Sequence, residues 1–371
     1  MTTATAAVAR GANADFTIEQ IDVAAPGPGE VRVRIAGVGL CHTDLVFRDQ
    51  VETFAKPAIL GHEGAGVIEA LGEGVEGLAA GDAVMLGFSS CGGCPRCAEH
   101  LPSYCNLFVP LNYAGMRLED GSTAYAKGEE RMSSHFFGQS SFSSLAVTRA
   151  RNVVKVPEGV TVPLEYLGTL GCGFQTGAGA VLRSMDCKPG SSLIVFGGGP
   201  VGLSAVMAGV IRECSTVILV EPVEARRKIA QEFGATHVID PGAVDDLGAA
   251  IRAILPLGVD AALDTTGVVP VIEAGLASLA PHGIIGLVGV PHDPGAAISV
   301  NITALMTPGL RVIGIIEGDS EPQDFIPELL AYHAQGKFPF DKLIKTFPLD
   351  QINEAIAAQA RGECIKVVLV P

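Results

Sequence analysis

The sequence predicts an α/β protein with two domains, one built on a doubly wound parallel sheet and one rich in turning β-structure. First, 371 residues with 48% hydrophobic content are too many for one small core. Second, short apolar strands alternate with helices from about residue 190 to residue 316, which is typical of a parallel sheet with helices on both faces. Third, glycine-punctuated apolar segments precede this region, at residues 64–74 and 81–87.

Each expected element follows from its own run of residues. Residues 31–37 alternate apolar and charged side chains, which predicts a half-buried strand, whereas residues 88–145 are turn-rich and predict little regular structure. In the α/β region we expect strands at 192–196, 216–220, 237–239, 259–263 and 283–288, and helices at 200–212, 223–233, 245–254 and 268–279.

The last segment of the chain returns to the first domain. Two helices, at 323–335 and 349–360, precede a strand at 365–370. We therefore assign residues 1–174 and 317–371 to the β-rich domain and residues 175–316 to the α/β domain.

The composition disfavours several classes of protein. A formal net charge of −15 argues against a nucleic-acid partner, which a basic face would bind. The first residues lack the charged start and apolar core of a secretory signal, and no apolar run is long enough to span a bilayer. We therefore expect a cytoplasmic protein with no membrane partner, whose nine cysteines are metal ligands or free thiols rather than disulfides.

A glycine-rich turn follows the first strand of the α/β region. Gly197, Gly199 and Gly202 form G-x-G-x-x-G before an expected helix, and Glu221 ends the next strand. This context predicts a Rossmann dinucleotide site, because the glycines let backbone approach a pyrophosphate at the helix N-terminus. Glu221 would bind the adenosine ribose and repel a 2′-phosphate, which favours NAD over NADP, although Arg226 and Arg227 slightly weaken that preference. The alternative is a structural turn with a solvated Glu221.

Four cysteines lie close together in the turn-rich segment. Four thiolates on one short loop match a closed tetrahedral zinc site within a lobe at residues 88–110. Spacing alone leaves an iron–sulfur cluster or disulfides open. The four are Cys91, Cys94, Cys97 and Cys105.

Three further metal-ligand candidates are far apart in the sequence. Cys41, His62 and Cys172 each lie among glycines. Two cysteines and one histidine can hold a catalytic zinc and leave a fourth position open. Spacing alone leaves a buried core cysteine and a hydrogen-bonded loop histidine equally plausible.

Several motifs in order resemble the zinc-containing medium-chain alcohol dehydrogenases. They are CHTDL, GHEGAGVIEALGEGV, GDAV, CGGCPRCAEH, GCGFQTGAGA and FGGGPVGLSA, and the later GIIEGDSEPQDFIPELL and GKFPFDKLI resemble the bacterial aryl (benzyl) and terpenoid branch. The resemblance implies a GroES-like catalytic domain beside the Rossmann domain and two zinc ions per chain. It puts a catalytic zinc on Cys41, His62 and Cys172 and a structural zinc on the four-cysteine lobe.

The resemblance also implies roles near the catalytic zinc. Asp44 resembles the carboxylate that orients the histidine ligand, and Glu63 resembles the glutamate that can approach the metal. Thr43 resembles the hydroxyl residue that takes the substrate proton. The family relay often ends at a histidine where this chain has Val46, so proton release needs the ribose hydroxyls and water, or another base.

Cofactor contacts follow from the same resemblance. His42 and Lys366 match residues near the cofactor phosphates, and Thr176 matches a residue beside the nicotinamide. Pro200 and Val201 begin the helix after the glycine turn.

The substrate expected from these motifs is a primary aromatic or allylic alcohol, such as a benzyl, cinnamyl or terpenoid alcohol. An apolar pocket would be lined by Val46, Phe88, Leu111, Phe136 and Phe137, although each phenylalanine could equally be plain core. The alternatives are a general aliphatic or formaldehyde-type enzyme, or a zinc-stabilised NAD-binding sensor without turnover. The family pairs subunits at the sheet edge near residues 301–315, which implies a homodimer or homotetramer.

Overall fold

The computed structural model describes residues 2–371 and divides the chain into two compact units. Unit 1 comprises residues 1–173, 321–334 and 339–371, and unit 2 comprises residues 174–320 and 335–338. Residues 174, 317–320 and 335–338 belong to unit 2, whereas the sequence prediction put them in the β-rich domain. The Phe338 ring packs edge-on against Phe174 of unit 2, with ring centroids 6.5 Å apart.

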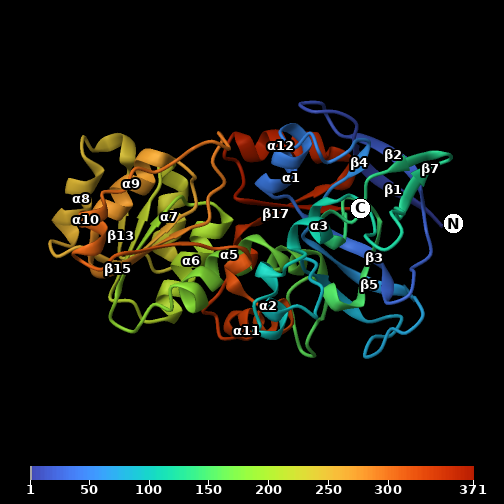
Figure 1. Cartoon of the computed structure of the whole chain (residues 1–371), viewed down its shortest axis with the longest axis horizontal. Helices are drawn as coiled ribbons and strands as arrows, with labels where there is room; N and C mark the ends of the chain where they lie inside the picture. Colours follow the sequence, from blue (N-terminus) through green and yellow to red (C-terminus); the bar gives the residue numbers. More distant parts are fainter. Residues whose placement is uncertain (1) are drawn as a thin grey trace. The chain divides into compact units, whose positions relative to one another are not determined.

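Unit 2 contains a six-stranded, entirely parallel sheet in the order β13-β12-β11-β14-β15-β16. Figure 1 labels β13 and β15 of this sheet. Its strands are β11 (Ser192–Phe196), β12 (Thr216–Val220), β13 (His237–Ile239), β14 (Val259–Asp264), β15 (Leu279–Leu287) and β16 (Arg311–Gly314). Its helices are α5 (Gly173–Gly179), α6 (Pro200–Ile211), α7 (Glu224–Glu232), α8 (Leu247–Ile254), α9 (Val269–Ala277) and α10 (Ile302–Met306).

Both faces of this sheet are buried because both carry helices. Ile194 and Phe196 lie in one core cluster with residues of α8 and α9. Leu193 and Val217 lie under α6, where Gly209 allows the helix to approach them. The doubly wound fold predicted from the sequence is therefore confirmed.

Unit 1 contains two sheets. One has five strands in the order β4-β1-β2-β7-β8, and the other has seven in the order β10-β6-β5-β3-β18-β17, with β9 also paired to β3. The strands are β1 (Thr2–Ala9), β2 (Thr17–Val23), β3 (Glu30–Gly39), β4 (Ala58–Ile59), β5 (Gly64–Leu71), β6 (Ala83–Leu86), β7 (Tyr125–Lys127), β8 (Glu130–Met132), β9 (Leu145–Arg149), β10 (Val153–Lys155), β17 (Ile344–Pro348) and β18 (Lys366–Val370).

Short helices fill the connections of unit 1. They are α1 (His42–Asp49), α2 (Pro95–Ala98), α3 (Phe108–Tyr113), α4 (Leu164–Leu167), α11 (Pro322–Ala334) and α12 (Ile352–Ala360). Strand β18 pairs antiparallel with β3, so the last segment of the chain completes a sheet begun near its start. Within residues 2–371, no helix is long and apolar enough to cross a membrane.

Candidate functional site: a zinc centre and a dinucleotide turn

The three predicted ligands of the catalytic zinc lie together in unit 1. Cys41 precedes α1, His62 lies between β4 and β5, and Cys172 precedes α5. One ligand atom from each of these residues and one from Glu63 lie within 4.8 Å of one another. Residues more than a hundred positions apart in the sequence therefore form one compact donor set.

The donor set fits a zinc ion. His62 Nε2 is buried and has no hydrogen-bond partner among residues 2–371, as expected of a nitrogen reserved for a metal. The Cys172 side chain holds the pKa of the Cys41 thiol well below its ordinary value. Thiolate sulfur and imidazole nitrogen are the ligands of catalytic zinc sites that keep one position open.

The Asp44 carboxylate fixes the orientation of His62. Its Oδ1 lies 2.9 Å from His62 Nδ1 and also accepts a 3.0 Å bond from the Gly61 N–H, while its Oδ2 accepts a 2.9 Å bond from the Cys41 N–H. With Nδ1 donating to Asp44, the Nε2 lone pair points toward the metal position. Asp44 thus connects two of the three ligand segments.

The start of α1 carries the predicted proton-transfer residues. The Thr43 hydroxyl lies 3.7 Å from the Cys41 sulfur, beside the donor set. Val46 lies one turn further along the same helix and offers no group that could hold a proton. His42, the first residue of α1, is exposed.

Lys366 has a different environment from the one predicted. We expected a phosphate contact, but its ammonium forms a short ion pair with Glu63 and donates a 3.2 Å hydrogen bond to the Leu40 carbonyl. The residue is only 1% exposed, because β18 lies beside β3 next to the donor set. The buried ammonium compensates the buried Glu63 carboxylate.

An aromatic wall contacts the histidine ligand. The Phe137 ring stacks on the His62 imidazole with centroids 4.4 Å apart, and Phe136 meets the same imidazole edge-on at 5.4 Å. Phe108 continues the wall, 6.4 Å from Phe137 and 5.7 Å from Phe88. The predicted residue Leu111 is buried on the same helix as Phe108.

The four-cysteine lobe is a separate cluster. Its sulfur atoms approach to 3.6 Å (Cys94 to Cys97) and 3.9 Å (Cys94 to Cys105), well beyond a disulfide bond of about 2.05 Å. The Asn106 backbone N–H lowers the pKa of the Cys94 thiol to about 6. Four sulfurs within 4.8 Å of one another, including Cys91, leave no open position and fit a closed tetrahedral zinc site.

The glycine turn of unit 2 has the geometry that phosphate binding requires. Gly197 has φ of +97°, and a Cβ on Gly202 would lie 1.8 Å from the Gly197 carbonyl oxygen. Gly199 caps α6 and Pro200 is its first residue, so the helix N-terminus faces the turn. The predicted residue Val201 follows on this helix, and Thr176 is buried on α5.

Glu221 lies at the end of β12 against this turn. Its carboxylate accepts hydrogen bonds from Gly198 N–H at 2.6 Å and Val223 N–H at 2.8 Å, and it is 3% exposed. The Arg226 guanidinium is 3.9 Å away and partly offsets its charge.

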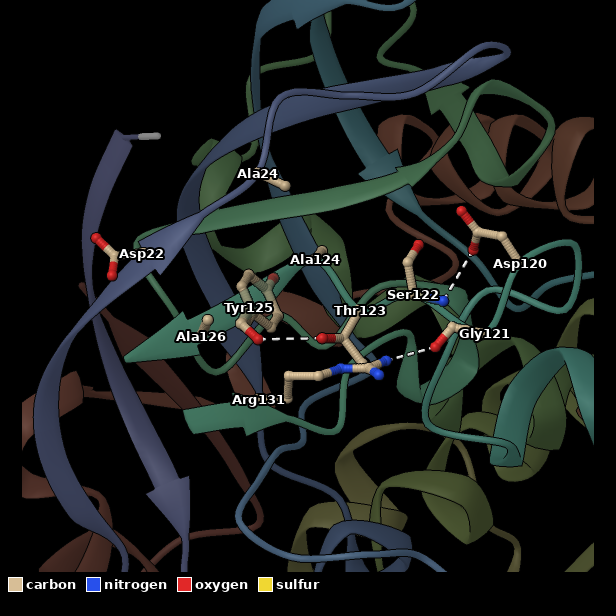
Figure 2. A pocket seen from close by; sticks show the side chains of 10 residues that line it. All are labelled: Asp22, Ala24, Asp120, Gly121, Ser122, Thr123, Ala124, Tyr125, Ala126 and Arg131. Atoms are coloured by element: carbon tan, nitrogen blue, oxygen red, sulfur yellow. Dashed lines mark hydrogen bonds between the residues drawn. The ribbon is translucent and has the colours of Figure 1, made fainter. Parts of the chain in front are cut away.

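A hollow of about 300 Å³ lies on unit 1, and no residue of either metal cluster lines it (Figure 2). Its polar groups bond to one another, as when the Asp120 carboxylate accepts the Ser122 N–H at 2.8 Å and Arg131 donates to the Gly121 carbonyl. None of the predicted site residues lines it. We therefore do not assign the substrate to this hollow.

Two features of the zinc site gave no signal in the sequence. The ion pair of Lys366 with Glu63 depends on strand pairing between distant segments. Gln139 binds the backbone on both sides of Glu63, yet a single glutamine in a turn-rich segment has no spacing that would identify it.

Comparison with known proteins agrees with this geometry. Residues 27–158 match the alcohol dehydrogenase GroES-like domain, and residues 200–332 match the zinc-binding dehydrogenase family. Geraniol dehydrogenase of Castellaniella defragrans is 47% identical over 99% of this chain and 97% of its own length.

Two solved structures are also similar over the whole chain. An alcohol dehydrogenase zinc-binding domain protein from Burkholderia ambifaria has 48% identity and a TM-score of 0.96, covering 100% of this chain and 99% of its own. Benzyl alcohol dehydrogenase from Acinetobacter calcoaceticus has 39% identity and a TM-score of 0.95, with the same coverage. The chain therefore belongs to the zinc-dependent medium-chain alcohol dehydrogenases, whose cofactors are zinc and a nicotinamide dinucleotide.

Proposed function

We propose that this chain oxidises primary allylic or aromatic alcohols to aldehydes and transfers the hydride to NAD⁺. The observation that carries the proposal is the Phe137 ring, which stacks on the His62 imidazole with ring centroids 4.4 Å apart. It supports an apolar aromatic wall next to the proposed histidine ligand. A planar unsaturated substituent on the alcohol carbon would pack against such a wall. The names of two relatives, geraniol dehydrogenase and benzyl alcohol dehydrogenase, support the same substrate class.

The zinc ligands in this proposal are Cys41, His62 and Cys172. A zinc ion bound there supplies Lewis-acid polarisation of the alcohol oxygen, which lowers the pKa of its hydroxyl. Asp44 holds His62 in the tautomer that leaves Nε2 free for the metal. Thr43 Oγ1 would take the alcohol proton as the carbon gives up its hydride, and would pass its own proton on.

The route of proton release in this chain differs from the usual family relay beyond Thr43. Val46 cannot continue a relay from Thr43, so we infer that the proton leaves through the ribose hydroxyls and water, or through another base. Neighbouring Asp44 already accepts three hydrogen bonds and is fully buried, which makes it unsuited to this role.

A substrate panel tests the proposal. We expect kcat/KM for benzyl, cinnamyl and geranyl alcohols to exceed that for ethanol by at least about a hundredfold, since the difference in buried apolar area is several methylene equivalents. Phe137→Leu should reduce this ratio while zinc content stays at two per chain. Equal or higher efficiency with ethanol or with formaldehyde adducts would identify a general aliphatic or formaldehyde-type enzyme instead.

NAD preference rests on Glu221. Glu221→Gln keeps the shape but removes the charge that would repel a 2′-phosphate, so we expect the kcat/KM ratio of NADP to NAD to rise at least about tenfold. Arg226→Gln is the matched control and should lower that ratio. An unchanged ratio in both variants would show that Glu221 does not contact the ribose.

We also propose that the chain forms a homodimer or homotetramer. Strand β16 pairs only with β15 among the strands of residues 2–371, and exposed Ile302 and Met306 lie nearby on α10. An open sheet edge with apolar neighbours suits pairing with a second copy. Light scattering on the purified protein would show a monomer if this proposal is wrong.

A further inference from the structure

A short segment backs the loop that carries His62. Residues 139–142 bind this loop residue by residue: the Ser140 hydroxyl donates to the Ile59 carbonyl at 2.6 Å, the Phe142 N–H to the Leu60 carbonyl at 2.9 Å, and the Ser141 N–H to the Gly61 carbonyl at 2.9 Å. The ligand loop therefore takes its shape from a neighbour more than seventy residues away in the sequence.

Gln139 completes this series with its side chain. Its Nε2 donates a 2.9 Å hydrogen bond to the His62 carbonyl, and its Oε1 accepts a 3.0 Å bond from the Gly64 N–H. The two bonds lie on either side of Glu63. The Ser141 hydroxyl also donates to Oε1 at 2.9 Å, and Gln139 is fully buried.

Gln139 and Ser141 approach the ligand loop too closely for a residue larger than glycine at position 64. A Cβ at Gly64 would lie 3.0 Å from Gln139 Oε1 and 2.8 Å from Ser141 Cβ. The backbone in and just before the backing segment is unusual, because Ser140 within it and His135 and Phe137 before it all have positive φ, between +49° and +59°. Such conformations persist only where the surroundings impose them.

The hydrogen bonds of Gln139 fix the backbone on either side of Glu63, whose side chain lies within the donor set. One carboxylate oxygen pairs with Lys366, and the other lies 3.4 Å from the Gly173 N–H, next to Cys172. A movement of the 62–64 backbone would shift both His62 Nε2 and this carboxylate relative to the two cysteine sulfurs.

We propose that Gln139 is a positioning residue for the zinc site, whose amide clamps the backbone on both sides of Glu63 and sets where His62 meets the metal. The inference rests on the proposed ligands Cys41, His62 and Cys172. The proposal adds a residue that contacts neither metal nor substrate. Phe137, which stacks on His62, lies two residues before Gln139, so the same short segment supplies both the aromatic wall and the support of the ligand loop.

Gln139→Met tests the clamp, because methionine keeps the length and volume but loses both hydrogen bonds to the ligand loop. It also loses the bonds of the amide to the Ser141 hydroxyl and to the Leu86 and Gly87 carbonyls. Asn112→Leu is the matched control: Asn112 is also fully buried and bridges the Ser89 N–H and carbonyl at 2.8 and 2.9 Å, but it does not touch the ligand loop. Both variants should lose thermal stability to a similar extent.

Only Gln139→Met should alter the metal. We expect one of the two zinc ions to dissociate to a chelator about 10–100 times faster, as for other residues that support metal ligands. The visible bands of the protein with cobalt at the catalytic position should also move, and kcat should fall more than KM rises. Identical cobalt spectra and zinc-loss rates in the two variants would overturn the proposal.

Two further measurements test the proposal if Gln139→Met does not fold well. Gln139→Glu keeps the acceptor for Gly64 but loses the donor to His62, and should show an intermediate rate of zinc loss; wild-type behaviour would count against the clamp. In the unaltered protein, the Gly64 amide should resist hydrogen exchange, and free exchange would contradict the clamp directly. If wild-type protein itself shows no cobalt bands that depend on Cys172, the ligand assignment fails instead.

Discussion

The two metal clusters of this enzyme are built in opposite ways. The four-cysteine lobe takes every ligand from residues 91–105, and the sulfurs of Cys94 and Cys105 accept bonds from backbone N–H groups of the same loop. The other cluster draws Cys41, His62 and Cys172 from three segments of unit 1, with buried charges around them. The first needs only a local turn, whereas the second needs the completed domain.

This difference has a chemical meaning. Four sulfurs close a tetrahedral site and leave a metal with a structural role. Two sulfurs and one nitrogen leave a position for substrate, and the buried Asp44, Glu63 and Lys366 around them must be paired for the site to exist at all. Four predictions separate the two clusters, in order of decreasing effect.

The largest effect should follow loss of a ligand at the open cluster. Cys172→Ser should lower kcat by at least about 1,000-fold, because Lewis-acid activation contributes several kcal/mol. Zinc content should fall from two to one per chain while the far-UV circular dichroism is retained. Full activity with one zinc would show that the open cluster is not catalytic.

Loss of a ligand at the closed cluster should act on stability. Cys97→Ser should lower the apparent Tm by roughly 5–15 °C, since binding of a structural zinc is coupled to folding. The residual kcat below that temperature should stay within about tenfold of the wild type if the lobe only holds a loop. A drop as large as that of Cys172→Ser would mean that the two clusters share a function.

A smaller effect is expected from the carboxylate behind His62. Asp44→Asn keeps the size of the side chain but weakens its hold on the Nδ1 proton, so activity or zinc affinity should fall about 10–100-fold. Asp82→Asn is the control, because the Asp82 carboxylate pairs with Lys155 at 3.0 Å and belongs to neither cluster. Equal behaviour of the two variants would argue that Asp44 does not orient the ligand.

The smallest effect is expected from a change in the release of the alcohol proton. Val46→His supplies a base near the expected relay, so turnover near neutral pH should rise by up to about tenfold if proton release limits it. The pH–rate profile should then gain a new inflection close to the histidine pKa of about 6.5. An unchanged profile would mean that another step is limiting.

The α/β domain was the most predictable part of the fold. Strands 192–196, 216–220 and 237–239 have the predicted bounds, and helix 200–212 ends one residue earlier than expected. The first two of these strands are buried almost throughout, and buried parallel strands have continuous apolar runs, which explains the accuracy there.

The β-rich unit was less predictable. Strands β1 and β2 are built from small or mixed residues that show no clear alternation, and they are held by pairing with each other. Strands β7 and β8 have only three residues each, within the segment where we expected little regular structure. Their stability comes from the rest of the sheet, which a local pattern does not contain.

The residues of the candidate site differ in the same way in how well the sequence predicts them. The four cysteines could be identified from spacing within a few residues, whereas Cys41, His62 and Cys172 depended on the family resemblance. The partners of Lys366 and the two-sided bonds of Gln139 depend on tertiary contacts, and neither amino-acid type nor position indicates them.

The order of strands in unit 1 also determines which parts of this unit can fold first while the chain is being synthesised. Strand β18, which carries Lys366, pairs with β3, and residues 174–320 of unit 2 lie between them in the chain. Domains generally fold as units while the chain is being made. The inserted Rossmann unit therefore leaves the ribosome before the first unit can close, and the four-cysteine loop can capture its metal well before the open cluster has its full surroundings.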